Sequence, residues 1–150
     1  RYSMMARWYE ALFPVLEELH VGFVAFSPMA NGLLTGAYGR DDKFDPKLDY
    51  RSAMPQFTPE GEKKNGELLR ILGVLAEEKH ATPAQISLAW MLCKKPYIVP
   101  IPGSRKVERM RENAGAADIV LSPAEEAQID HILDTIPMSA VFGGTAVKSR

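Results

Sequence analysis

The sequence predicts an α/β fold in which parallel strands alternate with helices. Two short apolar runs carry this prediction, VGFVAFS at residues 21–27 and YIVPI at residues 97–101, because both are rich in the β-branched and aromatic residues of buried strands. Segments with helical periodicity separate the two runs, and strands separated by helices indicate a parallel sheet. Two strands alone leave sheet edges without partners, so the chain is expected to form part of a larger α/β fold.

Residues 8–19 are expected to be helical, although Pro14 interrupts the segment. Proline removes a helical hydrogen bond but fits a first turn, so we expect a break at Pro14 or a helix that restarts there. The apolar side chains near one face of this helix are Trp8, Leu12, Val15, Leu16 and Leu19. The strand over residues 21–27 follows, and its uninterrupted apolar character predicts burial on both faces.

The segment after this strand, residues 28–57, contains several glycines and prolines and many charges. It is expected to be a long βα loop with at most a short helical turn near Leu33. Loops of this length are uncommon as plain connections, so the segment is a candidate for a functional or mobile role.

Two helices are expected between the loop and the second strand. Thr58 is a favourable N-cap with Pro59 in the first turn, and the helix should extend to about residue 79. Its buried side chains are expected to be Leu68, Ile71, Leu72 and Leu75. TPAQ at residues 82–85 is a capping box and opens a second helix. The apolar stripe of that helix is Ile86, Ala89, Trp90 and Cys93.

Beyond the strand at residues 97–101, a helix is expected at about residues 106–113. SPAE at residues 122–125 is another capping box and should start a helix that extends to about residue 133. The tail, residues 137–150, contains glycine and lacks periodicity, so it is expected to be irregular.

Composition excludes several classes of function. The chain is 46% hydrophobic and 25% charged, with a net charge of −1, so no overall field recruits nucleic acid or an anionic membrane. It has no apolar run of ~20 residues and no signal peptide, so membrane insertion is not expected. It also lacks the His/Cys spacing of metal sites. The single cysteine, Cys93, fits a reducing compartment, and a cytoplasmic location is expected.

Two stretches, VGFVAFSPMANGLLTG and IVPIPGSRKVERMREN, together resemble the aldo-keto reductase family. The group that includes the general stress protein and pyridoxal-reductase-like members is the most similar. The resemblance implies a (β/α)8 TIM barrel that binds a nicotinamide dinucleotide without a Rossmann domain. Residues 21–26 then match the seventh strand, residues 98–101 the eighth, and residues 1–3 the tail of the sixth. Because a whole barrel needs ~250 residues, the chain is expected to be a single partial domain, the C-terminal half of the barrel.

The resemblance also implies a cofactor site, since ligands bind at the C-terminal ends of barrel strands. Phe26 matches a position where the family usually has Tyr stacked on the nicotinamide ring. The residues that would line the pyrophosphate path are Ser27, Pro28, Met29, Asn31 and Leu33. Family members often carry a basic residue at the Asn31 position, so a charge contact is lost there. The alternative is that Phe26 is a core aromatic and that Pro, Asn and Gly form only a turn.

The strongest expected site follows the second strand, in PGSRKVERMREN. Gly103 permits close backbone approach, and amides at a helix start favour a phosphate. Arg105 and Arg109 would share a helix face if the helix begins early, and would clamp the 2′-phosphate of NADP(H), which NAD lacks. The full expected set here is Ile101, Pro102, Gly103, Ser104, Arg105, Arg109, Glu112 and Asn113. The alternative is a solvated helix with Arg105–Glu108 and Arg109–Glu112 ion pairs worth ~0.3–0.5 kcal/mol each.

The family's catalytic Tyr, Lys, Asp and His belong to the first half of the barrel, so no catalytic residue is expected in this chain. Its tyrosines do not stand at the motif position, and His20, His80 and His131 lie beside charged helical residues typical of solvated positions. The leading hypothesis is therefore the cofactor-binding half of an NADP(H)-dependent reductase of aldehydes and ketones. Its partners would be a small carbonyl substrate and either a missing N-terminal half or another copy. The alternative is a non-catalytic nucleotide-binding or interaction module that self-associates.

Overall fold

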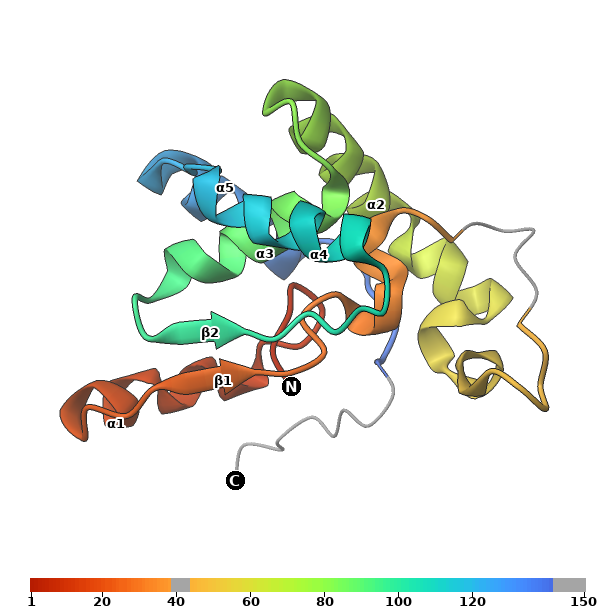
Figure 1. The fold of residues 1–150 in the computed structure, drawn as a ribbon, viewed down its shortest axis with the longest axis horizontal. Helices are drawn as coiled ribbons and strands as arrows, with labels where there is room; N and C mark the ends of the chain where they lie inside the picture. Colours follow the sequence, from red (N-terminus) through yellow and green to blue (C-terminus); the bar gives the residue numbers. More distant parts are fainter. Residues whose placement is uncertain (39–43, 142–150) are drawn as a thin grey trace.

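A parallel pair of strands organises the fold of this computed structural model, which describes residues 1–38 and 44–141. Strand β1 (Phe23–Ala25) pairs with β2 (Ile98–Pro100) in parallel, with Phe23 opposite Ile98 and Ala25 opposite Pro100. Helices α2 (Pro59–Glu78) and α3 (Pro83–Lys94) connect them, and α3 packs against β2 (Figure 1). The parallel arrangement expected from the sequence is confirmed.

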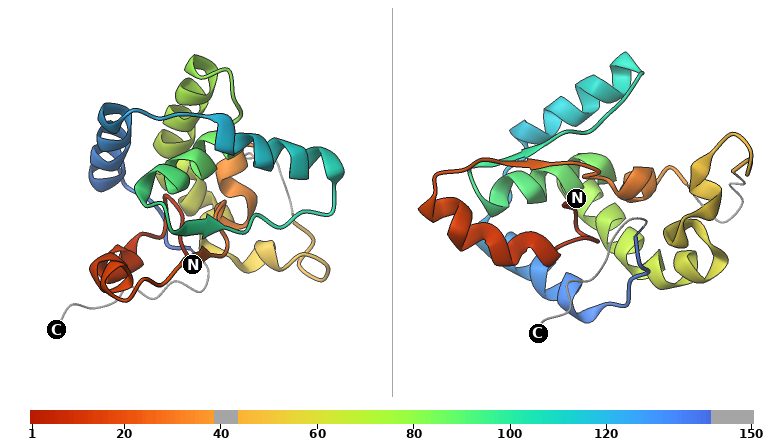
Figure 2. Two further views of the ribbon diagram at one scale, coloured as in Figure 1. Left: turned by 60° about the vertical axis from the view of Figure 1, so that its left-hand side comes forward. Right: turned by 90° about the horizontal axis from the view of Figure 1, so that it is seen from below.

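The remaining elements surround this centre. Figure 2 shows from two further sides that α4 stands out from the body of the molecule, and all of its side chains are partly or fully exposed. The other elements, in chain order, are the 3₁₀ helix η1 (Trp8–Leu12), α1 (Phe13–Glu18), the 3₁₀ helices η2 (Ala30–Thr35), η3 (Tyr50–Ala53) and η4 (Pro55–Phe57), α4 (Val107–Ala114), η5 (Gly115–Asp118) and α5 (Pro123–Thr135).

The expectation that the first strand is buried on both faces is wrong. Ala25 and Ile98 are buried, but Val24 is 63% exposed and its register partner Val99 is 55% exposed. Neighbouring side chains on a strand point to opposite faces, and α3 covers only one of them. Within the described parts of the chain, nothing buries the Val24–Val99 face.

The N-terminal helix is split as Pro14 suggested, because α1 starts at Phe13 with Pro14 in its first turn. The predicted apolar stripe, however, lies largely in solvent, with Leu12 and Leu19 exposed. Phe13 makes the core contact instead, and its ring centroid lies 5.7 Å from that of Tyr2. A 3₁₀ helix has 3.0 residues per turn, so η1 does not hold the face that a period of 3.6 predicts.

The centre of the core is Trp90 on α3, which is fully buried. Its ring stacks on Tyr2 with the centroids 5.6 Å apart, and its Nε1 donates to Asp130 Oδ1 at 2.9 Å. Lys94 also donates to Asp130, and Arg7 Nη1 lies 3.8 Å from the same carboxylate. The buried indole thus joins α3 to α5 without leaving its N–H unpaired.

Every expected helix cap is confirmed. Thr58 Oγ1 accepts from Gly61 N at 3.1 Å, and both capping boxes form, between Thr82 and Gln85 and between Ser122 and Glu125. These caps fix where α2, α3 and α5 begin, because each satisfies amides that have no partner inside the helix. Helix α2 buries Leu68 and Leu72 as expected, whereas Ile71, Leu75 and the Cys93 thiol of α3 are only half-buried.

The long loop is more structured than expected, since it holds η2, η3 and η4 rather than a single turn. Arg51 explains part of this order: its guanidinium lies 4.6 Å from the Tyr38 ring centroid and 4.3 Å from that of Phe44. Asp49 Oδ1 accepts from Arg51 N and Nε at 3.0 and 2.9 Å. This stacking is invisible to local sequence patterns because it joins residues far apart in the loop.

The two ends of the chain also differ from regular elements. Residues 1–3 form no strand, but Tyr2 N donates to Phe26 O at 3.3 Å, so they run beside the end of β1. Of the expected irregular tail, residues 137–141 contain no helix or strand, and residues 142–150 lie outside the described residues, as do residues 39–43 of the loop.

The α5 capping box should make the stability of the chain depend on acid pH. Glu125 Oε1 lies 2.5 Å from Lys79 Nζ, and Oε2 accepts from Ser122 N at 2.8 Å. These contacts lower the pKa of Glu125 from 4.5 to about 2, and the bond with Lys79 is the largest cause of the shift. The folded pKa lies below the unfolded one, so the stabilisation is present above pH 4.5 and is lost as the pH falls towards 2.

Urea unfolding of the chain at pH 6 and at pH 3 measures this loss. Glu125→Gln keeps the capping geometry without the charge, so its stability should fall less between the two pH values than that of the unaltered chain. Glu18→Gln, on exposed α1, is the control and should keep the original pH dependence. Equal pH dependence of all three proteins would contradict the assignment.

Candidate functional site

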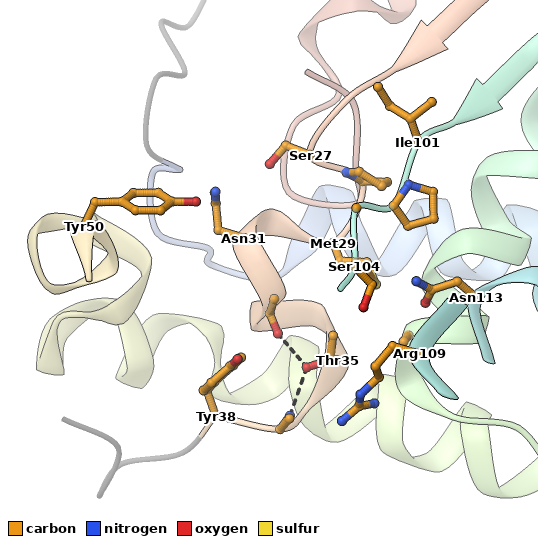
Figure 3. Close-up of a pocket in the computed structure, with 16 residues that line it drawn as sticks. Ser27, Met29, Asn31, Thr35, Tyr38, Tyr50, Ile101, Ser104, Arg109 and Asn113 are labelled. Carbon is orange, nitrogen blue, oxygen red and sulfur yellow. Dashed lines mark hydrogen bonds between the residues drawn. The ribbon is translucent and has the colours of Figure 1, made fainter. Parts of the chain in front are cut away.

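A cavity of about 430 Å³ lies beyond the ends of β1 and β2, between η2 and the start of α4. Figure 3 shows how the two strands lead into the two loops that form its walls. Residues of the expected cofactor site that line it are Ser27, Pro28, Met29, Asn31, Ile101, Pro102, Gly103, Ser104, Arg109 and Asn113. Two segments separated by about seventy positions in the chain therefore meet at one site, at the strand ends where α/β folds bind ligands.

The wall after β1 has an unusual backbone. Ser27, Ala30 and Asn31 have positive φ values of 55°, 48° and 61°. For residues with a side chain this left-handed conformation costs roughly 1–2 kcal/mol each. Ala30 N donates to Ser27 O at 3.2 Å, which closes the turn. Such strain persists where the surroundings over-determine the backbone, and it is common at ligand sites.

Arg1 binds the side chains of this wall without lining the cavity itself, and the sequence analysis did not predict this role. Its Nη1 donates to Ser27 Oγ at 2.6 Å and to Asn31 Oδ1 at 3.2 Å, and its Cζ lies 5.3 Å from the Phe26 ring centroid. Burial lowers the pKa of the Arg1 guanidinium below its ordinary value, and the charge interaction with Tyr50 opposes this shift. The only sequence signal is a basic residue in the segment that resembles the end of the sixth strand.

The wall after β2 ends in the first turn of α4. Ser104 Oγ accepts from Lys106 N at 3.1 Å, and α4 begins at Val107 with no side-chain cap from Lys106. The expectation that Arg105 and Arg109 share a helix face is therefore wrong, because Arg105 precedes the helix. The Arg105 side chain is exposed and does not line the cavity.

Arg109 lines the cavity and also forms an ion pair. Its Nη1 lies 2.7 Å from Glu112 Oε2, so this part of the solvated-helix alternative is realised. A guanidinium has five N–H donors, and the pair occupies only one of its nitrogens. The Arg109 side chain is 47% exposed, and Glu112 lies outside the cavity. Glu112 O accepts from Gln85 Nε2 at 3.0 Å, which ties α4 to the capping box of α3.

Leu33 and Phe26 do not line the cavity. Leu33 is 2% exposed and lies in the core, because the kink at Asn31 and Gly32 turns it inwards. The Leu33 side chain therefore takes no part in the cavity wall, and a contact of its backbone amide with the pyrophosphate stays a prediction. Phe26 is 49% exposed and packs under Arg1, so the alternative of a plain core aromatic is wrong.

Several lining residues were not predicted. They are Gly32, Thr35, Ala37, Tyr38, Tyr50 and Ala84. Figure 3 shows Tyr38 and Tyr50 on the side of the cavity formed by the long loop. Thr35 Oγ1 donates to Gly32 O at 2.6 Å, and this bond holds the turn below Tyr38. The length of the loop was the signal that pointed to all of these residues except Ala84, which lies in α3.

Outside the cavity, the described part of the chain contains few side chains that could take part in catalysis or bind a metal. His20, His80 and His131 are exposed, as expected of solvated histidines. Tyr2 is buried, and its pKa is raised because burial and its 2.6 Å bond to Glu10 disfavour the phenolate. Over residues 1–38 and 44–141, no cluster of His, Cys, Asp and Glu has the geometry of a metal site, and no helix has the length and apolarity needed to cross a bilayer.

Residues 1–134 match the model of the aldo/keto reductase family. Aldo-keto reductase str7 of Strobilurus tenacellus is 40% identical over 119 residues, which cover 79% of this chain and 35% of the relative. The aldo-keto reductase yakc of Schizosaccharomyces pombe, whose name specifies NADP(+), is 38% identical over 117 residues, which cover 78% of this chain and 34% of the relative. The chain spans about a third of the length of these relatives.

Solved structures agree with this match. An aldo-keto reductase from Klebsiella pneumoniae in complex with NADPH has 26% identity and a TM-score of 0.60, covering 88% of this chain and 37% of that one. A glycerol dehydrogenase from Gluconobacter oxydans has 23% identity and a TM-score of 0.82, covering 96% of this chain and 44% of that one, which shows a shared fold. By these matches, and by its parallel strands with a cavity at their ends, the chain belongs to the aldo/keto reductase family.

Proposed function

We propose that this chain is the NADP(H)-binding part of an aldo-keto reductase, with β1 and β2 as the seventh and eighth strands of the barrel. The observation that carries the proposal is the convergence of both strand-end loops on one cavity. The curated relative named for NADP(+) and the Klebsiella pneumoniae structure with NADPH support the choice of cofactor. The substrate of the whole enzyme would be a small aldehyde or ketone.

The α4 side of the cavity suits the 2′-phosphate end of NADP(H). Arg109 supplies a positive charge, Ser104 a hydroxyl, and the uncapped first turn of α4 supplies backbone amides. A Cβ added to Gly103 would meet no described atom within 4 Å, so the wall leaves space for a ligand there. Asn113, which also lines the cavity, would contact the adenine.

The β1 side suits the rest of the dinucleotide. Small side chains and a tight turn at Ser27 and Asn31 expose polar groups that would bind the pyrophosphate. Phe26 would offer the face of its ring to the nicotinamide, and the neighbouring Arg1 limits which side of that ring is open.

Bound NADPH would supply the hydride for carbonyl reduction. The residues of this chain would hold and orient the cofactor, while the proton donor and its supporting residues would come from the part of the barrel that precedes β1. The chain by itself is therefore expected to bind NADPH and to show no turnover.

NADPH fluorescence tests the proposal. Titration of the chain into NADPH should enhance and blue-shift the nicotinamide emission, because binding removes the ring from water. An assay with NADPH and a reactive aromatic aldehyde should show no oxidation above background. Absence of any binding would sink the proposed function, and robust turnover would overturn the assignment of the proton donor to another segment.

A second candidate, a self-associating interaction module, is favoured by one observation. The Val24–Val99 face and the outer edges of β1 and β2 are unpaired within the described chain, and such edges recruit further strands. Light scattering distinguishes the candidates, since a module of this kind should be a dimer or larger in the absence of NADPH. A monomer that binds NADPH would favour the reductase.

A further inference from the structure

Two side chains in the wall of the cavity that follows β1 can act either as hydrogen-bond donors or as acceptors, and the sequence does not specify which. The hydroxyl of Ser27 and the amide of Asn31 can each donate or accept. An anion in the cavity can only accept hydrogen bonds, so each of the two side chains contributes to its binding only as a donor. Their actual sense therefore depends on what else each side chain binds.

Arg1 determines the sense of Ser27. A guanidinium has no acceptor, so in the 2.6 Å contact Arg1 Nη1 donates and Ser27 Oγ accepts. The hydroxyl hydrogen of Ser27 is then free to point to another acceptor on the cavity side. Arg1 also donates to Asn31 Oδ1 at 3.2 Å, so one guanidinium nitrogen joins both side chains.

Gln56 completes the arrangement at Asn31. Its Nε2 donates to Asn31 Oδ1 at 3.3 Å and also lies 3.5 Å from Ala30 O, and its side chain is fully buried. Asn31 Oδ1 thus receives two donors, which turns the NH₂ group the other way. Figure 3 shows this nitrogen directed away from η2, towards the hydroxyl of Tyr50.

We propose that Arg1 and Gln56 are positioning residues that make Ser27 and Asn31 hydrogen-bond donors for the pyrophosphate of the dinucleotide. The proposal rests on the proposed function. Arg1 does not itself line the cavity, so it acts through these two side chains and adds a positive charge behind them. The arrangement supplies a charge on this wall although Asn31 is neutral.

Two ligands separate this effect from general nucleotide binding. NADP(+) has both the pyrophosphate and the 2′-phosphate, whereas adenosine 2′-monophosphate has only the latter. By calorimetry, Arg1→Met should weaken NADP(+) binding about fivefold to twentyfold and change adenosine 2′-monophosphate binding by less than about twofold. Arg1→Lys should recover most of the NADP(+) affinity, because an ammonium also donates and carries the charge.

Coupling tests whether Arg1 acts through its two partners. In a Ser27→Ala, Asn31→Ala background, Arg1→Met should weaken NADP(+) binding clearly less than in the unaltered chain, since its partners are gone and only the effect of its charge remains. Gln56→Met leaves the Arg1 charge in place and should also weaken NADP(+) selectively. This second variant therefore distinguishes the effect of orienting the Asn31 amide from the effect of the Arg1 charge on NADP(+) affinity.

The outcomes are distinguishable. If the unaltered chain binds neither ligand, the proposed function fails and the inference fails with it. If it binds both and Arg1→Met weakens them equally, or weakens neither, the proposed function stands and the positioning role is overturned. An undiminished effect of Arg1→Met in the Ser27→Ala, Asn31→Ala background also overturns it.

Discussion

Arg109→Ala is expected to weaken NADPH binding by about 10-fold to 100-fold while NADH binding changes by less than about threefold. Arg109 lines the cavity next to the first turn of α4, where a 2′-phosphate would lie. A charge-assisted hydrogen bond to phosphate is worth about 1.5–3 kcal/mol, and NADH lacks that phosphate. The substitution also leaves the Glu112 carboxylate without its 2.7 Å partner, which adds repulsion towards an anion.

Fluorescence titration with both cofactors at one ionic strength measures this difference, because charge contacts weaken with salt. Arg111→Ala is the matched control, since it removes the same charge from an exposed position of α4 that does not line the cavity. It should change both affinities by less than about twofold. Equal losses of NADPH and NADH binding with Arg109→Ala would count against a 2′-phosphate role.

Gly61→Ala is expected to destabilise the chain by about 2–4 kcal/mol, although alanine is the better helix former. A Cβ at Gly61 would lie 2.1 Å from Pro55 O and 3.1 Å from the Gln56 backbone, so the first turn of α2 would have to move off η4. The clash is with backbone, which cannot rotate away as a flexible side chain does.

Gly73 in the same helix provides the matched control. A Cβ there meets nothing within 4 Å, so Gly73→Ala should stabilise the chain by about 0.5–1 kcal/mol through helix propensity alone. Urea unfolding of both variants measures the free energies. Stabilisation by Gly61→Ala comparable to that by Gly73→Ala would show that η4 does not pack on α2 as described.

The helix starts were predictable because a helix cap involves only residues that are close together in the sequence. Thr58, Thr82 and Ser122 bond amides within three residues of themselves, so short sequence motifs contain all the necessary partners. The two strands were predictable for the same reason, from composition within a few residues. The position of the cavity followed from the family resemblance, which implies a barrel, together with the rule that ligands bind at the ends of barrel strands.

Other features depend on backbone turns and on packing between distant segments, which the sequence analysis did not predict. Leu33 faces the core because positive φ values at Asn31 and Gly32 turn the chain, and Val24 faces solvent because α3 covers one side of the strands. Arg105 lies outside the cavity because α4 begins two residues later. The Arg105 error came from extending a helical period ahead of the helix start, and the Val24 error came from reading an apolar run as burial on both faces.

The sequence by itself determined where α2, α3 and α5 begin and the parallel α/β character, because these follow from local propensity and short motifs, while the family resemblance pointed to the two loops that meet at the cavity. Only the tertiary structure decided that Arg1 and Gln56 reach the same Asn31 oxygen from opposite directions in the chain. The physical reason is that hydrogen-bond sense is set by the partner, and folding, not sequence neighbourhood, chooses the partner.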